Sequence, residues 1–164
     1  MGRVVAIADG DTLTILTTDQ GQHRVRLAGI DTPEKRQPFG QVAKDHLSSL
    51  VNGQTVTVNY YKRDHDGRIV GKVLTSGTDA GLRQVEAGLA WHYKRYEQEQ
   101  SDWDRAAYAR AEVQARAERR GLWRDLRQSP RGTSGDPRKR KTALPRRQAL
   151  RRLRFGFEPV ETAV

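Results

Sequence analysis

Residues 26–34 read RLAGIDTPE, an apolar run that contains an arginine and two carboxylates and is broken by a proline. The branched residues before Asp31 are typical of a strand, and Pro33 cannot continue a central sheet pairing, so we expect this strand to end near Asp31. Asp31 and Glu34 would then lie at the strand end and in the following turn. Oxygen ligands suit calcium or magnesium, and arginine pairs with phosphate oxygens, so this cluster could hold a cation and a phosphate together. An ordinary turn with a surface ion pair is the alternative.

Two further strands are predicted before this stretch, at residues 3–8 and 12–18, where branched apolar side chains predominate. Between them stands the tripeptide Asp9-Gly10-Asp11. Glycine adopts backbone conformations that are closed to other residues, so Gly10 could allow both carboxylates to point toward a common site. A plain hairpin turn is the alternative. Together with the strand that ends near Asp31, these segments predict an antiparallel meander of three strands.

The following residues, up to about 125, alternate between helical and strand patterns. The predicted elements are helices at 39–51, 79–87 and 102–120 and strands at 55–61 and 69–74. Each helix shows apolar residues on one face, and Trp103 is assigned to the buried face of the last one. Five short antiparallel strands with a helix between the third and fourth are the layout of the OB-fold, a small barrel. We therefore predict an α+β fold built on a five-stranded OB-fold barrel with three helices.

The chain has 164 residues, no cysteine and a formal net charge of +10. This length fits one domain with an appendage, and the lack of cysteine excludes disulfides, thiolate metal sites and cysteine nucleophiles. The four histidines are scattered without metal-ligand spacing. No apolar stretch approaches the roughly 20 residues of a membrane span, so we expect no membrane association. The first residues lack the hydrophobic region of a signal peptide, which leaves the compartment open.

The positive charge is concentrated toward the C-terminus. Residues 1–125 hold 19 Lys and Arg against 17 Asp and Glu, whereas residues 126–164 hold 11 against 3. Prolines, glycines and serines near 129–137 are typical of a linker, and a basic arm follows. We predict one domain at residues 1–125 and a basic tail at 126–164 that is disordered in isolation. Such a tail raises affinity for any polyanion through counterion release, without reading sequence.

Five charged side chains from separate segments could converge at one end of the predicted barrel: Asp11, Arg26, Asp31, Glu34 and Arg68. Around them the chain resembles the thermonuclease family, the staphylococcal nuclease-like domain, over about residues 2–125. The matching pieces are DGDT at 9–12, RLAGIDTPE at 26–34, DGR at 66–68, GLA at 88–90 and RGLW at 120–123. Each piece is short, but all five occur in order at spacings that fit one domain.

The resemblance implies a calcium-dependent endonuclease that hydrolyses phosphodiester bonds of DNA and RNA with little sequence specificity, leaving 3′-phosphate and 5′-hydroxyl ends. It implies that Ca²⁺ is held by the side chains of Asp11 and Asp31 and the backbone carbonyl of Thr32, and that the catalytic residues are Arg26, Glu34 and Arg68. These roles agree with general chemistry. Oxygen ligands suit calcium, a glutamate can act as general base, and arginines can stabilise charge that develops in the transition state. Asp9 is expected to support the metal ligands.

The sequence departs from the family prototype at His65 and Asp66, where the prototype has a lysine and a tyrosine near the terminal phosphate. Tyr93 and Tyr96 are candidates for substrate binding, in a register shifted by about one residue. The alternative is that these tyrosines, together with Trp91 and His92, pack the last helix against the barrel.

The alternative function is a non-catalytic nucleic-acid-binding module on the same barrel. A degenerate copy of the domain would be expected to lose a carboxylate or an arginine, whereas this sequence keeps all five charged residues, which favours the enzyme. A protein-interaction barrel would leave the five matching pieces unexplained. Nothing in the sequence points to an obligate protein partner.

Overall fold

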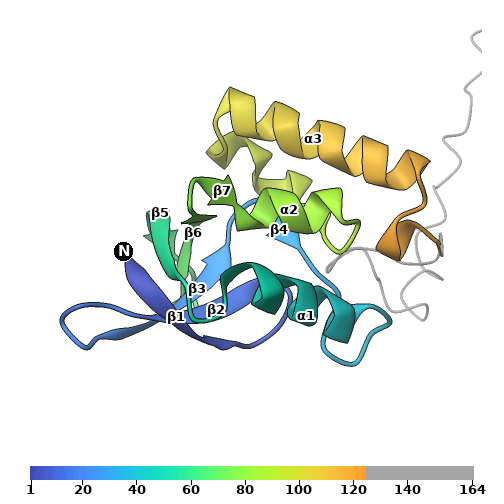
Figure 1. The fold of residues 1–164 in the computed structure, drawn as a ribbon. Coiled ribbons are helices and arrows are strands. Elements are labelled where there is room, and N and C mark those ends of the chain that lie inside the picture. The colour runs from blue at the N-terminus through green and yellow to red at the C-terminus, as the bar shows by residue number, and fades with distance from the viewer. Residues whose placement is uncertain (125–164) are drawn as a thin grey trace, which may run out of the picture. The chain divides into compact units, whose positions relative to one another are not determined.

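The computed structural model describes residues 1–124, apart from the side chain of Tyr61, and Figure 1 shows how their helices and strands are arranged. The predicted basic tail at residues 126–164, and its predicted disorder, lie outside the described residues. None of the helices among residues 1–124 has the length and apolar character needed to cross a bilayer.

Five strands close into a barrel, which confirms the predicted α+β barrel. They are β1 (Gly2–Ile7), β2 (Thr12–Leu16), β3 (Gln22–Leu27), β5 (Thr55–Arg63) and β6 (Ile69–Thr75). The order in the sheet is β3-β2-β1-β5-β6, with antiparallel neighbours, and a parallel pairing of β3 with β6 joins the two edges. The interior is filled by branched side chains, among them Val4, Leu13, Val25 and Val73, which are all buried. Closure pairs the strand edges with each other and leaves the ends of the barrel for a site.

Three helices cover one side of the barrel: α1 (Gly40–Val51), α2 (Ala80–Glu86) and α3 (Asp102–Ala117). α1 contacts β1 and α2, while α2 contacts β6 and α3, so that α3 is outermost (Figure 1). The shorter elements are β4 (Ile30–Asp31), β7 (Thr78–Asp79), β8 (Trp91–His92) and the 3₁₀ helices η1 (Lys94–Glu99) and η2 (Gly121–Arg124). The sequence predicted the three helices but none of these short elements.

The strand expected to run as far as Asp31 is interrupted. β3 ends at Leu27, and Gly29 takes a φ of 76°, a left-handed conformation that glycine adopts without strain. The chain then enters β4, which pairs with β8 and not with a barrel strand; Asp31 lies opposite Trp91. The prediction of one continuous strand was wrong because the partner of β4 is far along the chain, where no local pattern can reveal it.

The last helix is shorter than predicted, and Trp103 does not belong to its buried face. α3 ends at Ala117, and Arg119 adopts a left-handed φ of 52°. Trp103, assigned to the buried face, is 67% exposed, whereas Ala111 and Ala115 are buried. Residues seven and eleven positions apart lie on the same face of a helix, so Asp104 shares the face of these two alanines. Trp103 is one position earlier and therefore lies beside that face.

A polar cluster joins α3 to the start of α2. The Tyr108 hydroxyl donates to Asp79 Oδ2 at 2.9 Å, and Asp79 caps α2 by accepting from the backbone N–H groups of Gly81 and Leu82. Lys72 Nζ lies 3.5 Å from Asp79 and also contacts Asp104. Burial, together with the negative charge of Asp79, raises the pKa of Tyr108 above its ordinary value of 10.0. Burial alone would lower the pKa of Lys72, but its hydrogen bond with Asp104 and the charge of Asp79 reverse this and raise it.

We expect the protein to lose stability steeply as the pH rises above about 10. Both Tyr108 and Lys72 have raised pKa values when folded, so the folded state keeps these protons after the unfolded state has lost them. Their contribution is therefore complete below the ordinary values of 10.0 and 10.5 and is lost at higher pH. Across this pH range the thermal unfolding temperature of Tyr108→Phe should fall less steeply with pH than that of the wild type. Tyr60→Phe, at an exposed tyrosine, should keep the wild-type slope, and equal slopes for all three proteins would contradict the assignment.

Candidate active site

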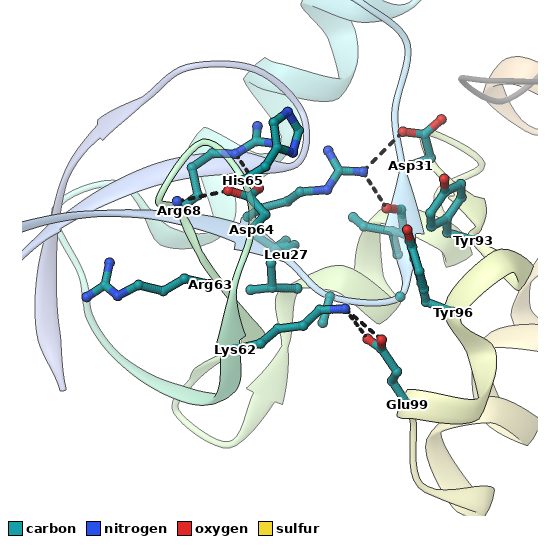
Figure 2. A pocket seen from close by; sticks show the side chains of 15 residues that line it. Leu27, Asp31, Lys62, Arg63, Asp64, His65, Arg68, Tyr93, Tyr96 and Glu99 are labelled. Atoms are coloured by element: carbon teal, nitrogen blue, oxygen red, sulfur yellow. Dashed lines mark hydrogen bonds and ion pairs between the residues drawn. The ribbon is translucent and has the colours of Figure 1, made fainter.

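A pocket of about 400 Å³ opens at one end of the barrel, where β3, the β5–β6 hairpin and η1 come together (Figure 2). Its charged and aromatic lining residues are Arg26, Asp31, Lys62, Arg63, Asp64, His65, Arg68, Tyr93, Tyr96 and Glu99. Three of the five charged residues singled out in the sequence, Arg26, Asp31 and Arg68, therefore line one pocket.

Arg26 lies between two buried carboxylates. Its Nη1 donates to Asp11 Oδ2 at 3.2 Å, and its Nη2 donates to Asp31 Oδ1 at 3.3 Å and to the backbone carbonyl of Ile30 at 3.4 Å. Burial opposes the charged form, but Asp11 and Asp31 outweigh burial and raise the pKa of Arg26. The arginine thus stays charged and ties both carboxylates to the same end of the barrel.

Asp11 is placed by the turn between β1 and β2. Its backbone N–H donates to Asp9 Oδ1 at 3.1 Å, and its Oδ1 accepts from the Thr12 hydroxyl at 2.9 Å. Asp9 therefore shapes the turn that carries Asp11. The reason predicted for Gly10 was wrong, because its φ is not left-handed. Instead, a Cβ at this position would lie 2.7 Å from the Cβ of Ala43, so glycine is required for the turn to pack closely on α1.

Gln84 of α2 supports the same turn from the interior. Its Nε2 donates to the backbone carbonyl of Gly10 at 2.6 Å and to that of Ala43 at 2.9 Å, and its Oε1 faces Nδ1 of His46. The side chain is fully buried. Sequence reasoning missed Gln84. The only sign in the sequence that it is buried is its position next to an apolar residue of a predicted helix. Its bonds join α1, α2 and the Asp11 turn.

Asp31 and Thr32 are both buried where the chain leaves β4. Thr32 Oγ1 has no hydrogen-bond partner among the described residues. Glu34 lies two residues further on, in an exposed turn. Its carbonyl accepts from the backbone N–H of Gln37 at 2.7 Å, and its own N–H donates to Gln37 Oε1 at 2.7 Å. Within the described part of the chain, Glu34 is not among the residues that line the pocket.

Arg68 enters the pocket from the β5–β6 hairpin, where Asp64 lies beside it (Figure 2). Its Nε donates to Asp64 Oδ2 at 2.8 Å, and its Nη2 lies 3.3 Å from Asp66 Oδ2. Burial would raise the pKa of Asp64, but the hydrogen bonds from Arg68 outweigh burial and lower it. Asp64 is a second residue that sequence reasoning missed, although its spacing of four from Arg68 within a predicted turn was a signal.

Tyr93 and Tyr96 face the same pocket, with their ring centroids 5.6 Å apart. The alternative was that these tyrosines, together with Trp91 and His92, pack the last helix against the barrel. The structure supports it only for Trp91 and His92, which are buried.

Lys62 is another pocket residue that sequence reasoning missed. A register shift between Tyr60 and Lys62 interrupts the alternation of β5, so a simple two-residue pattern does not show where Lys62 points.

The described residues contain no group of three or more His, Asp and Glu side chains arranged to hold a metal ion. The predicted ligand set has only two carboxylates, and a backbone carbonyl completes it. Asp11 and Asp31 are buried, and counted together with Arg26 they carry one more negative than positive charge. Carboxylate and carbonyl oxygens suit a hard cation such as Ca²⁺ or Mg²⁺, with water filling the remaining positions. The donor chemistry of these residues therefore fits the implied ion.

The fold and the site define a small barrel protein with a polar, arginine-containing pocket at one end of the barrel. The chain belongs to the staphylococcal nuclease family, whose model, described as staphylococcal nuclease homologue, matches residues 24–125. This confirms the resemblance found in the sequence.

Three relatives illustrate the range of the family. The chain is 40% identical over 125 residues to an uncharacterised endonuclease of Escherichia coli, covering 76% of this chain and 77% of that protein. It is 41% identical over 123 residues to an uncharacterised endonuclease of Haemophilus influenzae, covering 75% of this chain and 66% of that protein. It is 40% identical over 100 residues to a staphylococcal-like nuclease of Arabidopsis thaliana, covering 61% of this chain but only 29% of that protein.

Proposed function

We propose that this protein is a Ca²⁺-dependent nuclease that hydrolyses phosphodiester bonds of DNA and RNA with little sequence specificity and leaves 3′-phosphate and 5′-hydroxyl ends. The observation that carries the proposal is the position of Arg26, which lines the pocket while it bonds to the buried Asp11 and Asp31. Membership of the staphylococcal nuclease family and the names of the relatives support the nuclease class.

The side chains of Asp11 and Asp31 and the backbone carbonyl of Thr32 would hold the Ca²⁺. All three are buried residues, and the Asp11 turn is fixed from the interior by Gln84. A rigid pair of carboxylates favours a cation because little conformational entropy is lost on binding. When bound, the ion supplies positive charge beside a phosphate oxygen.

The arginines of the pocket bind and orient the phosphate. Arg26 and Arg68 are both held by carboxylates, so their guanidinium groups are oriented before the substrate arrives. A guanidinium keeps its charge at every physiological pH, and it stabilises the negative charge that grows on the phosphate oxygens in the transition state.

Glu34 acts in this proposal as the general base that takes a proton from the attacking water at its carboxylate. The turn that carries it is anchored by Gln37 and by the close approach of Gly40, where a Cβ would lie 2.1 Å from the Glu34 carbonyl oxygen. Tyr93 and Tyr96 offer faces on which a base or sugar can pack, a contact that tolerates any sequence.

Cleavage of single-stranded DNA and of RNA, measured with Ca²⁺, with Mg²⁺ and with a chelator, tests the proposal. We expect cleavage in Ca²⁺, none with the chelator, and products that end in a 3′-phosphate. Binding of both nucleic acids without cleavage in any metal would overturn the proposal and favour the non-catalytic binding module.

We also expect Ca²⁺ to raise the thermal unfolding temperature of the wild type, because a ligand that binds only the folded state stabilises it. Asp31→Asn and Asp11→Asn should each remove most of this rise, since each replaces a charged oxygen ligand with a neutral one. Asp45→Asn, at an exposed position on α1, is the matched control and should retain the full rise. Calorimetric titration with Ca²⁺ gives the affinities directly. If Ca²⁺ raised the unfolding temperature of both site variants as much as that of the wild type, these carboxylates would be excluded as ligands.

A further inference from the structure

Lys62 and Glu99 form an ion pair at the edge of the pocket. Both carboxylate oxygens of Glu99 lie 2.6 Å from Lys62 Nζ. Lys62 is at the end of β5, whereas Glu99 is the last residue of η1, so the pair links the barrel to the segment that carries the two tyrosines (Figure 2). The Lys62 ammonium also lies 4.6 Å from the centre of the Tyr96 ring. None of these contacts has a role in the proposed reaction.

The cations of the pocket differ in how firmly their carboxylate partners hold them. The side chains of Arg26 and Arg68 are 16% and 15% exposed, and they pair with carboxylates that are buried or held by backbone hydrogen bonds. Lys62 and Glu99 are 35% and 28% exposed, and both are long side chains. An ion pair of this kind contributes little free energy because solvent screens it and ordering two flexible chains costs entropy. Of these three cations, Lys62 is therefore released at the lowest cost.

The charge of the pocket limits how well it attracts a phosphate. Its lining contains four basic residues, Arg26, Lys62, Arg63 and Arg68, against three acidic ones, Asp31, Asp64 and Glu99. Glu99 alone among these three acidic residues comes from η1 and not from the barrel or its connections. It also lines a second pocket of about 260 Å³, together with Lys72 and Asp104. Glu99 therefore lines both the proposed site and a neighbouring pocket that contains a second carboxylate, that of Asp104.

We propose that Lys62 is a further substrate-binding residue, and that a backbone phosphate of the nucleic acid strand displaces Glu99 from it. In the free protein Glu99 holds the ammonium beside Tyr96. On binding, the phosphate takes the place of the carboxylate, which turns toward solvent. Tyr96 keeps the ammonium near the pocket during this exchange, because a cation is attracted to the face of an aromatic ring. The inference rests on the proposed function, since it assumes that the pocket receives a nucleic acid.

The exchange predicts that removing the charge of Glu99 strengthens binding. Glu99→Gln should bind a fluorescently labelled single-stranded oligothymidine up to about fivefold more tightly than the wild type, the factor expected for releasing an exposed ion pair. The slope of log affinity against log salt should stay close to that of the wild type, because a phosphate contacts Lys62 in both complexes. Binding is measured by anisotropy with a chelator present, so that cleavage does not contribute. Circular dichroism checks that each variant is folded.

Two further variants separate the exchange from a general effect of charge. Glu86→Gln makes the same change of charge at an exposed pair with Arg83 on α2, where the nearest oxygen lies 2.8 Å from Nη1, and Glu86 does not line the pocket. It should bind like the wild type. Lys62→Gln should weaken binding, and in that background Glu99→Gln should no longer strengthen it.

The outcomes distinguish the two proposals. A gain in Glu99→Gln that depends on Lys62 supports the exchange. A gain in affinity that is no larger than that of Glu86→Gln, or one that persists in the Lys62→Gln background, overturns the exchange and leaves the nuclease proposal intact. If no form of the protein binds the oligonucleotide but the wild type cleaves single-stranded DNA in Ca²⁺, the exchange fails and the nuclease proposal stands. Absence of both binding and cleavage overturns the two proposals together.

Discussion

Arg68→Ala is expected to lower kcat on single-stranded DNA by on the order of 10²-fold or more while the protein remains folded. The guanidinium lines the pocket and is oriented by Asp64, so its charge is available when negative charge develops on the phosphate. The substitution also leaves Asp64, which lines the pocket, and the nearby Asp66 without this arginine. Their negative charges repel a phosphate, so KM should rise as well.

A second substitution separates these two effects. Adding Asp64→Asn to Arg68→Ala removes one repelling charge, so KM should recover in part while kcat stays low. Arg105→Ala is the control, because Arg105 is paired with Asp102 at 2.6 Å on α3 and does not line the pocket. It should behave as the wild type. A folded Arg68→Ala protein with unchanged kcat would remove Arg68 from the mechanism.

Gln84→Leu is expected to lower the free energy of unfolding by on the order of 3 kcal/mol. The leucine cannot donate to the buried carbonyls of Gly10 and Ala43, and hydrogen bonds lost in the interior are not replaced by water. Because the Gly10 carbonyl belongs to the turn that carries Asp11, kcat should fall as well. Urea unfolding measures the first effect and a cleavage assay the second.

Gln114→Leu provides the matched control for this substitution. Gln114 is exposed on α3 and donates to Glu118 at 3.0 Å. Its replacement should change the free energy of unfolding by less than about 0.5 kcal/mol, as is usual for a surface position. Equal stabilities of Gln84→Leu and Gln114→Leu would show that the buried hydrogen bonds do not anchor the turn.

The charged residues that meet at this end of the barrel could be predicted largely from local sequence. Asp11, Arg26 and Asp31 belong to short stretches whose composition is unusual for a core, and in the structure Arg26 contacts both carboxylates. Arg68 was found in the same way and lies across the same pocket. Glu34 was grouped with them because it follows Asp31 by three residues, but it begins the exposed turn that Gln37 closes and is not among the described residues that line the pocket. Its role as base stays a prediction.

The residues that hold the site in place could not be predicted in this way. Gln84 contacts Gly10 across most of the domain's sequence, and Lys62 contacts Glu99 from a different element. Such contacts depend on how α2 and η1 pack on the barrel, which a local pattern does not encode. The register shift in β5 has the same effect, since it changes which side chains face the pocket without any change in composition.

The sequence by itself determined the strands of the barrel, the three helices and the chemical identity of the charged residues. Strand and helix periodicity report which face of each element is buried, and that information is local. The tertiary structure alone decided that β3 stops at Leu27, that β4 pairs with β8, and that Arg26 lies between two carboxylates. These features depend on free energies of pairing and burial between segments far apart in the chain, and only the closed barrel brings those segments together.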